Sequence, residues 1–261
     1  MKQPDLTIVV PTCNRAALLR ESLRSIVQTT NCRYEILAVD GASTDATPAV
    51  LQEAKWWLGD RLQIIREDRR EGFVKAANKG FRAARGRNLI WLNDDARPLE
   101  GALDRAVDQI DKSPVSIGLL ALFHRVNVAR NIAYETYLNG VPYRLLHVRG
   151  TLYANFAMGS AATYRHVNYF DERYFLNAAD PDLSLKVWNI GLRVVPAMDC
   201  LIDHDEHEDD RRLSDSAHAD NDNRKLFEKW DLPDRNPQFN EFNPIKPCTL
   251  RGLRSATPLA A

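Results

Sequence analysis

Two adjacent carboxylates follow a short apolar run in the stretch WLNDDARPL, residues 91–99. The apolar residues before them are typical of the inside of a sheet, and Pro98 prevents the segment from continuing as a central strand. Side by side at the end of a buried strand, Asp94 and Asp95 would repel each other and lose hydration energy. We therefore expect the pair to hold a ligand or a cation.

The two acids need not share one ligand, because successive residues leaving a strand point in different directions. A hard divalent cation such as Mg²⁺ usually takes one or two protein carboxylates and completes its shell with substrate phosphates and water. The pair therefore indicates a nucleotide diphosphate bound through a metal. A second interpretation is that the acids cap a helix starting near Leu99, since Asp is common before helices.

The elements that must position these acids follow from the alternation of apolar runs and amphipathic helical patterns. This alternation predicts an α/β fold, a mostly parallel sheet flanked by helices on both faces. The expected strands are 6–10, 34–40, 61–67 and 88–92, and the expected helices include 72–86, closed by Gly86.

Ligands of such sheets bind beyond the carboxyl ends of the strands. Three expected strands deliver polar residues or a tight turn to that edge, in the segments 11–15, 40–43 and 93–95. Their coincidence predicts a site for a polar ligand.

The second half of the chain is less regular. A strand is expected over 115–128, a helix over 180–191 and a short strand over 193–198. The segment 203–224 is polar almost throughout and is predicted to be a mobile loop or a loosely held helix. The proline-rich tail from Asp231 predicts an irregular, extended C-terminal extension.

Composition excludes several classes of protein. The 261 residues carry 35 Lys and Arg against 35 Asp and Glu, a balance that argues against a nucleic-acid partner. No stretch reaches the roughly 18 apolar residues that span a bilayer, and no secretory signal is evident. We expect a cytoplasmic protein whose four scattered cysteines are free thiols.

Five motifs resemble, in order and spacing, those of the family 2 glycosyltransferases. They are IVVPTCNR (8–15), VDGASTD (39–45), LNDDA (92–96), FDERYF (170–175) and ADPDLSLK (179–186). The resemblance covers roughly residues 6–205 and implies an inverting enzyme with a GT-A fold. It suggests a GT-A domain over 1–230, with a nucleotide-binding half (1–98) and an acceptor and catalytic half (99–230), followed by the tail 231–261.

The resemblance also implies where the nucleotide lies. The residue matching Asp40 contacts the base, and the turn carrying Pro11, Thr12 and Arg15 lies against base and ribose. Each has a plainer interpretation, because Asp40 suits a turn and Thr12 or Arg15 could cap the next helix.

In the LNDDA motif, the resemblance assigns Asp94 to the ribose and Asp95 to a Mn²⁺ or Mg²⁺ ion on the diphosphate. This chain has Asn93 where many members have the first Asp of the motif. His204 would complete the metal shell, although it could be one polar residue of an acidic loop, and His207 could be the ligand instead.

Asp180 matches the general base of the family. It could also be the N-cap of its helix, with Pro181 at the first helical position. Ala179 stands where members usually have Glu, and Asp182 is expected to support the helix start.

The implied activity is transfer of a sugar from a nucleotide-diphosphate sugar to a hydroxyl of a saccharide or lipid-linked acceptor, with inversion. A lipid-linked acceptor would bring peripheral association with the inner face of the membrane, although no amphipathic anchor is evident. Two alternatives are a sugar-phosphate nucleotidyltransferase and a non-catalytic nucleotide-sugar-binding protein. The first usually has a glycine-rich basic loop after strand one, and PTCNRAALL contains no glycine.

Overall fold

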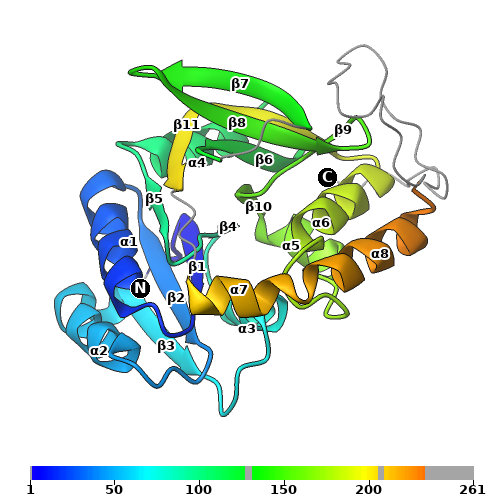
Figure 1. Cartoon of the computed structure of the whole chain (residues 1–261). Helices are drawn as coiled ribbons and strands as arrows, with labels where there is room; N and C mark the ends of the chain where they lie inside the picture. The colour runs from blue at the N-terminus through cyan, green and yellow to red at the C-terminus, as the bar shows by residue number, and fades with distance from the viewer. Residues whose placement is uncertain (1, 127–130, 205–208, 233–261) are drawn as a thin grey trace.

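The computed structural model describes residues 2–126, 131–204 and 209–232 (Figure 1). Within these ranges, eleven strands form one sheet whose main path runs β3-β2-β1-β4-β10-β6-β11-β5. Strand β8 pairs with β6 and carries β7 and β9 on either side, away from that path. No helix in this part of the chain is long and apolar enough to cross a membrane.

The first half of the sheet is parallel, as the alternating pattern predicts. Strand β1 pairs with β2 on one side and β4 on the other, and β2 pairs with β3. The elements are β1 (Leu6–Thr12), α1 (Ala16–Thr29), β2 (Tyr34–Asp40), α2 (Thr47–Leu58), a 3₁₀ turn (Gly59–Arg61), β3 (Leu62–Arg66), α3 (Phe73–Ala83) and β4 (Asn88–Trp91).

Gly86 has a different role from the predicted one, because α3 already ends at Ala83. A Cβ at position 86 would lie 2.5 Å from the backbone nitrogen of Thr7. The glycine therefore allows the chain to pass close to β1 and does not terminate the helix.

The second half of the sheet is mixed. Strand β10 joins the halves by pairing antiparallel with both β4 and β6, whereas β6 and β11 are parallel. The elements are β5 (Ala96–Pro98), α4 (Ala102–Asp111), β6 (Ile117–His124), β7 (Ile132–Leu138), β8 (Val141–Val148), β9 (Thr151–Tyr153), β10 (Ala157–Ser160), α5 (Ala161–His166), α6 (Ala179–Asn189), β11 (Arg193–His204), α7 (Asp210–Ser216) and α8 (Ala219–Trp230).

Two expectations for this half need correction, and a third is decided between its two alternatives. Strand β11 runs on to His204, beyond the predicted end at residue 198, because its last residues pair with β5. In its described part the polar segment 203–224 contains α7 and the start of α8, so of its two predicted states the helix is found and the loop is not. The helix after the acidic pair starts at Ala102, with Gly101 as its N-cap, so the pair does not cap it.

Some expectations fall outside the described residues. These are the end of the predicted strand 115–128, His207, Cys248 and nearly all of the proline-rich tail. Among the residues that the structure does describe, Cys32 and Cys200 are free thiols, as predicted.

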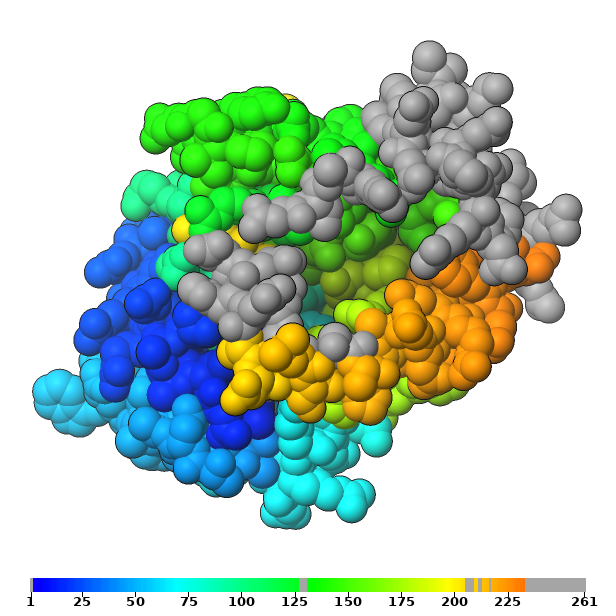
Figure 2. All heavy atoms as spheres, viewed as in Figure 1, coloured from blue at the N-terminus to red at the C-terminus, as the bar shows by residue number. Residues whose placement is uncertain are grey.

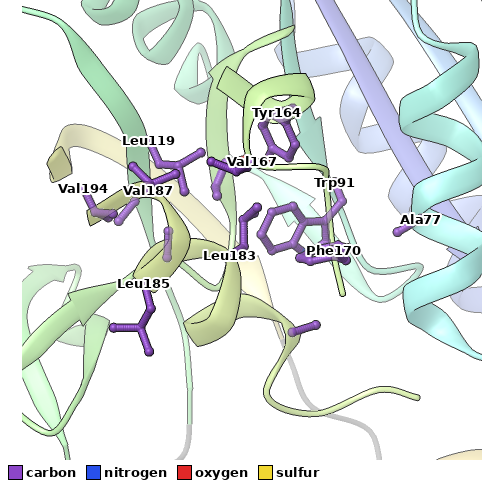
Figure 3. Packing of buried hydrophobic residues seen from close by; sticks show 14 of the residues in the cluster. Ala77, Trp91, Leu119, Tyr164, Val167, Phe170, Leu183, Leu185, Val187 and Val194 are labelled. Carbon is purple, nitrogen blue, oxygen red and sulfur yellow. Dashed lines mark hydrogen bonds between the residues drawn. The ribbon is translucent and has the colours of Figure 1, made fainter. Parts of the chain in front are cut away.

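Alternate residues of the central strands build two cores, one on each face of the sheet. Ile8 faces a cluster formed with α1, α2 and α4, whereas Val9 faces one formed with α3, α5, α6 and α8. Figure 3 shows the second cluster, in which Trp91 of β4 packs edge-on to Phe170 with ring centroids 5.0 Å apart. Leu183 of α6 belongs to the same cluster, so one core supports both the acidic motif and the helix that carries Asp180.

Candidate functional site

A cavity of about 510 Å³ opens at the carboxyl edge of β1 and β4, within the size range of small-molecule sites. Its walls come from both halves of the sheet and from the loop before α6. The wall includes six residues predicted to form the site: Pro11, Thr12, Asp94, Asp95, Asp180 and His204. The two others, Asp40 and Arg15, are buried next to it and do not line it.

The acidic pair is held by partners that the sequence places far away. Thr12, at the end of β1, donates its hydroxyl to Asp94 at 2.9 Å. Nη1 of Arg15 lies 2.6 Å from Oδ2 of Asp95 and 3.2 Å from Oδ1 of Asp94, and all three side chains are nearly inaccessible to water. Arg15 also contacts Asp209, just before α7, with Nε to Oδ2 at 2.6 Å. One guanidinium thus joins three carboxylates.

This arrangement explains how two adjacent acids are tolerated beneath a cavity. Burial alone would raise the pKa of Asp95, but hydrogen bonds and charge from His204 and Arg15 hold it well below its usual range. Burial likewise works against the charge of Arg15, and its pKa is nevertheless raised by Asp209, Asp94 and Asp95. Both groups are therefore ionised at neutral pH.

His204 lies next to the acidic motif because β11 ends opposite β5. Nε2 of His204 is 3.2 Å from Oδ1 of Asp95 and 3.2 Å from Nδ2 of Asn93. Asn93 thus contacts the imidazole. Among the described residues, Oδ1 of Asp95 has no hydrogen-bond partner besides this close approach of the imidazole.

These side chains fit a divalent cation that takes few protein ligands. A buried carboxylate oxygen and an imidazole nitrogen face each other beside the cavity, and phosphate oxygens and water would supply the remaining positions. Among the described residues, no group of three or more His, Cys, Asp or Glu side chains is arranged to hold a metal without such help.

Asp40 is engaged in the turn that follows β2. Its Oδ1 accepts the backbone N–H of Ser43 at 2.9 Å, and its Oδ2 lies 3.2 Å from Arg66. The side chain is 1% exposed, whereas the neighbouring Gly41 reaches the cavity wall. These contacts match the turn interpretation of Asp40. Its contact with the nucleobase stays a prediction.

Asp180 is the second residue of α6, because the helix starts at Ala179 and not at Pro181 as the N-cap interpretation expected. Ala178 is the N-cap and adopts a left-handed backbone with φ 64°, a conformation that costs a non-glycine residue energy. Nδ2 of Asn155 donates to Asp180 at 3.2 Å. Burial raises the pKa of Asp180 to about 8, against the lowering effect of this hydrogen bond.

Several polar residues of the cavity wall were not anticipated from the sequence. Arg70 donates to both oxygens of Asp215 in α7, at 2.5 and 2.7 Å. His124, at the end of β6, is fully buried, and burial lowers its pKa to about 3, so its ring is neutral. The strand-end rule could have found His124, but Arg70 and Asp215 are 145 positions apart and carry no local signal.

A mixed sheet with a cavity at the carboxyl ends of its parallel strands is an arrangement that binds small molecules in many α/β proteins. Comparison with known proteins identifies the family. Residues 7–169 match the model of the family described as Glycosyl transferase family 2, and the chain belongs to that family. A solved mannosyltransferase, PcManGT from Pyrobaculum calidifontis in complex with GDP-Man and Mn²⁺, superposes with a TM-score of 0.67 over 92% of this chain and 68% of its own. At 22% identity this likeness shows the fold, which is GT-A.

Curated relatives match a shorter region. The PGL/p-HBAD biosynthesis glycosyltransferase of Mycobacterium tuberculosis is 39% identical over 95 residues, 36% of this chain and 37% of that protein. The glycosyltransferase AglE of Haloferax volcanii is 28% identical over 116 residues, 44% of this chain and 38% of that protein. The match thus spans less than two-fifths of either relative.

Proposed function

We propose that the chain is an inverting, metal-dependent glycosyltransferase. It would transfer a sugar from a nucleotide-diphosphate sugar to an acceptor hydroxyl. One observation carries the proposal: a single cavity has Asp94, Asp95 and His204 on its wall together with Asp180, a carboxyl whose pKa is raised to about 8. A single-displacement transfer needs a base for the acceptor hydroxyl and a group that stabilises the leaving diphosphate, and a metal held by the acidic residues would supply the second.

The donor half of the site would lie over β1, β2 and β4. Pro11 and Thr12 border the base and ribose, Asp94 binds the ribose hydroxyl, and Asp95 with His204 holds Mn²⁺ or Mg²⁺. The bound metal would offset negative charge developing on the departing diphosphate. The domain division at about residue 98 and the assignment of 99–230 to acceptor and catalysis belong to this proposal.

Arg15 and Asp40 would act from behind the wall. Arg15 fixes the directions of Asp94 and Asp95 and compensates part of their charge, because it contacts both carboxylates. Asp40 holds the turn that presents Gly41 to the cavity; a direct contact with the base would require Arg66 to move away from it.

Asp180 would take the proton of the acceptor hydroxyl as its oxygen attacks the anomeric carbon. A base works best when its pKa is near the operating pH, and about 8 meets this condition better than the usual value of an aspartate. Asn155 orients the carboxylate through its hydrogen bond. The acceptor is a saccharide or a lipid-linked sugar, and the second kind would bring the protein to the inner face of the membrane.

The family match favours this proposal over a sugar-phosphate nucleotidyltransferase. A non-catalytic nucleotide-sugar-binding protein is the competing function, because Ala179 and Asn93 depart from the family motifs. Thermal shift with nucleoside diphosphates, with and without Mn²⁺, followed by a donor-sugar panel, tests both. Metal-dependent binding together with turnover of one donor supports the transferase, and binding without turnover of any donor and acceptor supports the competitor.

A further inference from the structure

One face of helix α8 packs against the loop before α6 and against the first turn of α6. The buried residues on that side, Asp222, Leu226 and Trp230, recur at four-residue spacing, and they are 0%, 2% and 7% exposed. Residues at this spacing lie on one helix face. The family match ends at residue 169, so neither α6 nor α8 is covered by it.

The first contact is between Asp222 and the loop before Asp180. Oδ2 of Asp222 accepts the backbone N–H groups of Phe175 and Leu176, both at 3.0 Å. Oδ1 lies 3.3 Å from the ammonium of Lys225, which supports the buried charge. A carboxylate bridging two successive N–H groups fixes the direction of the loop, because charge-assisted hydrogen bonds are short and strong.

The second contact is made by the last turn of α8. Nε1 of Trp230 donates to Oδ1 of Asp182 at 2.8 Å, and Lys229 lies 2.6 Å from the same oxygen. Asp182 is completely buried in the first turn of α6, two positions after Asp180. The two contacts therefore hold the chain on both sides of Asp180.

The loop between these contacts forms part of the cavity wall. Leu176, Asn177 and Ala178 line the cavity together with Asp180. Ala178 has a left-handed backbone, a conformation that persists only where surrounding contacts enforce it. The ring of Phe175 stacks on His218, just before α8, with centroids 4.1 Å apart. In Figures 1 and 2, α7 and α8 cross the same face of the molecule, from the β1 side toward α6.

We propose that α8 positions the catalytic base, with Asp222 and Trp230 as positioning residues that fix the loop and the first turn around Asp180. This inference rests on the proposed function of Asp180 as base. The ordering of residues 175–182 by these contacts can be measured independently of whether Asp180 is the base. Neither side chain would touch the substrate.

The decisive variant is Asp222→Ala, which removes the acceptor of both N–H groups. Displacing a catalytic group by about 1 Å can cost on the order of 10²-fold in rate, so kcat should fall by that order while nucleotide affinity is unchanged. Asp222→Asn keeps an oxygen that can accept both N–H groups and should recover most of the rate. The matched controls are Asp220→Ala and Asp220→Asn, because Asp220 is exposed on the same helix.

A second pair of variants covers the case in which Asp222→Ala does not fold. Trp230→Phe keeps an aromatic ring but loses the N–H donated to Asp182, and it should lower kcat without weakening nucleotide binding. Trp56→Phe is its control, because Trp56 is 88% exposed on α2. The inference would be overturned by wild-type kcat in Asp222→Ala, or in Trp230→Phe if Asp222→Ala does not fold. A rate loss matched by an equal loss of nucleotide affinity would also overturn it.

Hydrogen exchange separates this inference from the assignment of the base. A peptide spanning residues 173–179 should exchange faster in Asp222→Ala than in wild type or Asp220→Ala, because two protected N–H groups lose their acceptor. Unchanged exchange would overturn the role of α8 whatever the activity. Full activity in Asp180→Asn with faster exchange in Asp222→Ala would instead overturn the base and leave the ordering of the loop established.

Discussion

Nη1 of Arg15 lies 2.6 Å from Oδ2 of Asp95. This contact explains why two adjacent acids can follow a buried strand. The same nitrogen reaches Asp94, so one cation compensates both carboxylates. A divalent cation held by Asp95 and His204 would occupy the other side of the Asp95 carboxylate. Arg15 contacts Oδ2 of Asp95 and the cation would be held at Oδ1, so the two would not compete for the same oxygen.

Removing Arg15 should therefore destabilise the fold. Arg15→Ala leaves buried carboxylates without their partner, which typically costs about 3–5 kcal/mol of unfolding free energy. Arg20→Ala is the control, because its ion pair with Glu53 is exposed and such pairs contribute about 0–1 kcal/mol. Urea unfolding of both variants measures the difference, and equal, small losses would contradict a supporting role for Arg15.

The assigned metal ligands predict a second result. Asp95→Ala should abolish metal-dependent nucleotide binding in a protein that still folds, because Arg15 retains Asp94 and Asp209 as partners. Calorimetry with UDP, GDP and other nucleotides in the presence of Mn²⁺ measures it. Unchanged affinity for the preferred nucleotide would disprove the assignment of Asp95.

His204→Ala should raise the Mn²⁺ concentration needed for half-maximal activity, because Nε2 of His204 faces Oδ1 of Asp95. His207→Ala, three positions on in the sequence, should not. Titration of activity with Mn²⁺ compares the two variants. The opposite pattern would make His207 the ligand. Identical curves in all three proteins would show that neither histidine binds the metal.

The raised pKa of Asp180 predicts how rate depends on pH. A base must be ionised to accept a proton, so kcat should rise with pH and level off above about 8. A pH profile at saturating donor and metal measures this limb. A rate that is flat from about pH 6 to 9 would argue against a base with this pKa.

Burial of Asp180 should also lower the free energy of unfolding as pH rises from about 4 to about 8. Its pKa rises from an ordinary 3.8 to about 8 on folding, so between these values the folded protein holds a proton that the unfolded chain has lost. Stability then falls as pH rises from about 4 to about 8 and is constant above. Asp180→Asn should be more stable than wild type near pH 8, with the difference vanishing near pH 4. Thermal melts across this range check the sign, and a variant less stable at pH 8 would contradict the burial of this carboxyl.

The sequence allowed the architecture and the edge of the site to be predicted, because both follow from local patterns. Strand-end rules place Thr12 and Asp94 together, and the structure joins them by a hydrogen bond. The link from Arg15 to Asp209 spans 194 positions, and no local pattern indicates it.

The C-terminal helices were harder to predict for a physical reason. Asp222 is buried at a position where composition indicates solvent, because its partners are backbone N–H groups of a distant loop. The four-residue spacing of Asp222, Leu226 and Trp230 was the available signal. The start of α6 was missed because an alanine, Ala178, adopts a backbone that alanine rarely takes.

The most direct test of the account compares wild type with Asp180→Asn at saturating Mn²⁺ and donor, measuring nucleotide affinity and sugar transfer in the same preparations. If Asp180 is the general base, the two proteins will bind nucleotide equally and the variant will transfer sugar about 10²–10⁴-fold more slowly, the usual contribution of a general base. A variant that transfers sugar as fast as wild type would contradict it.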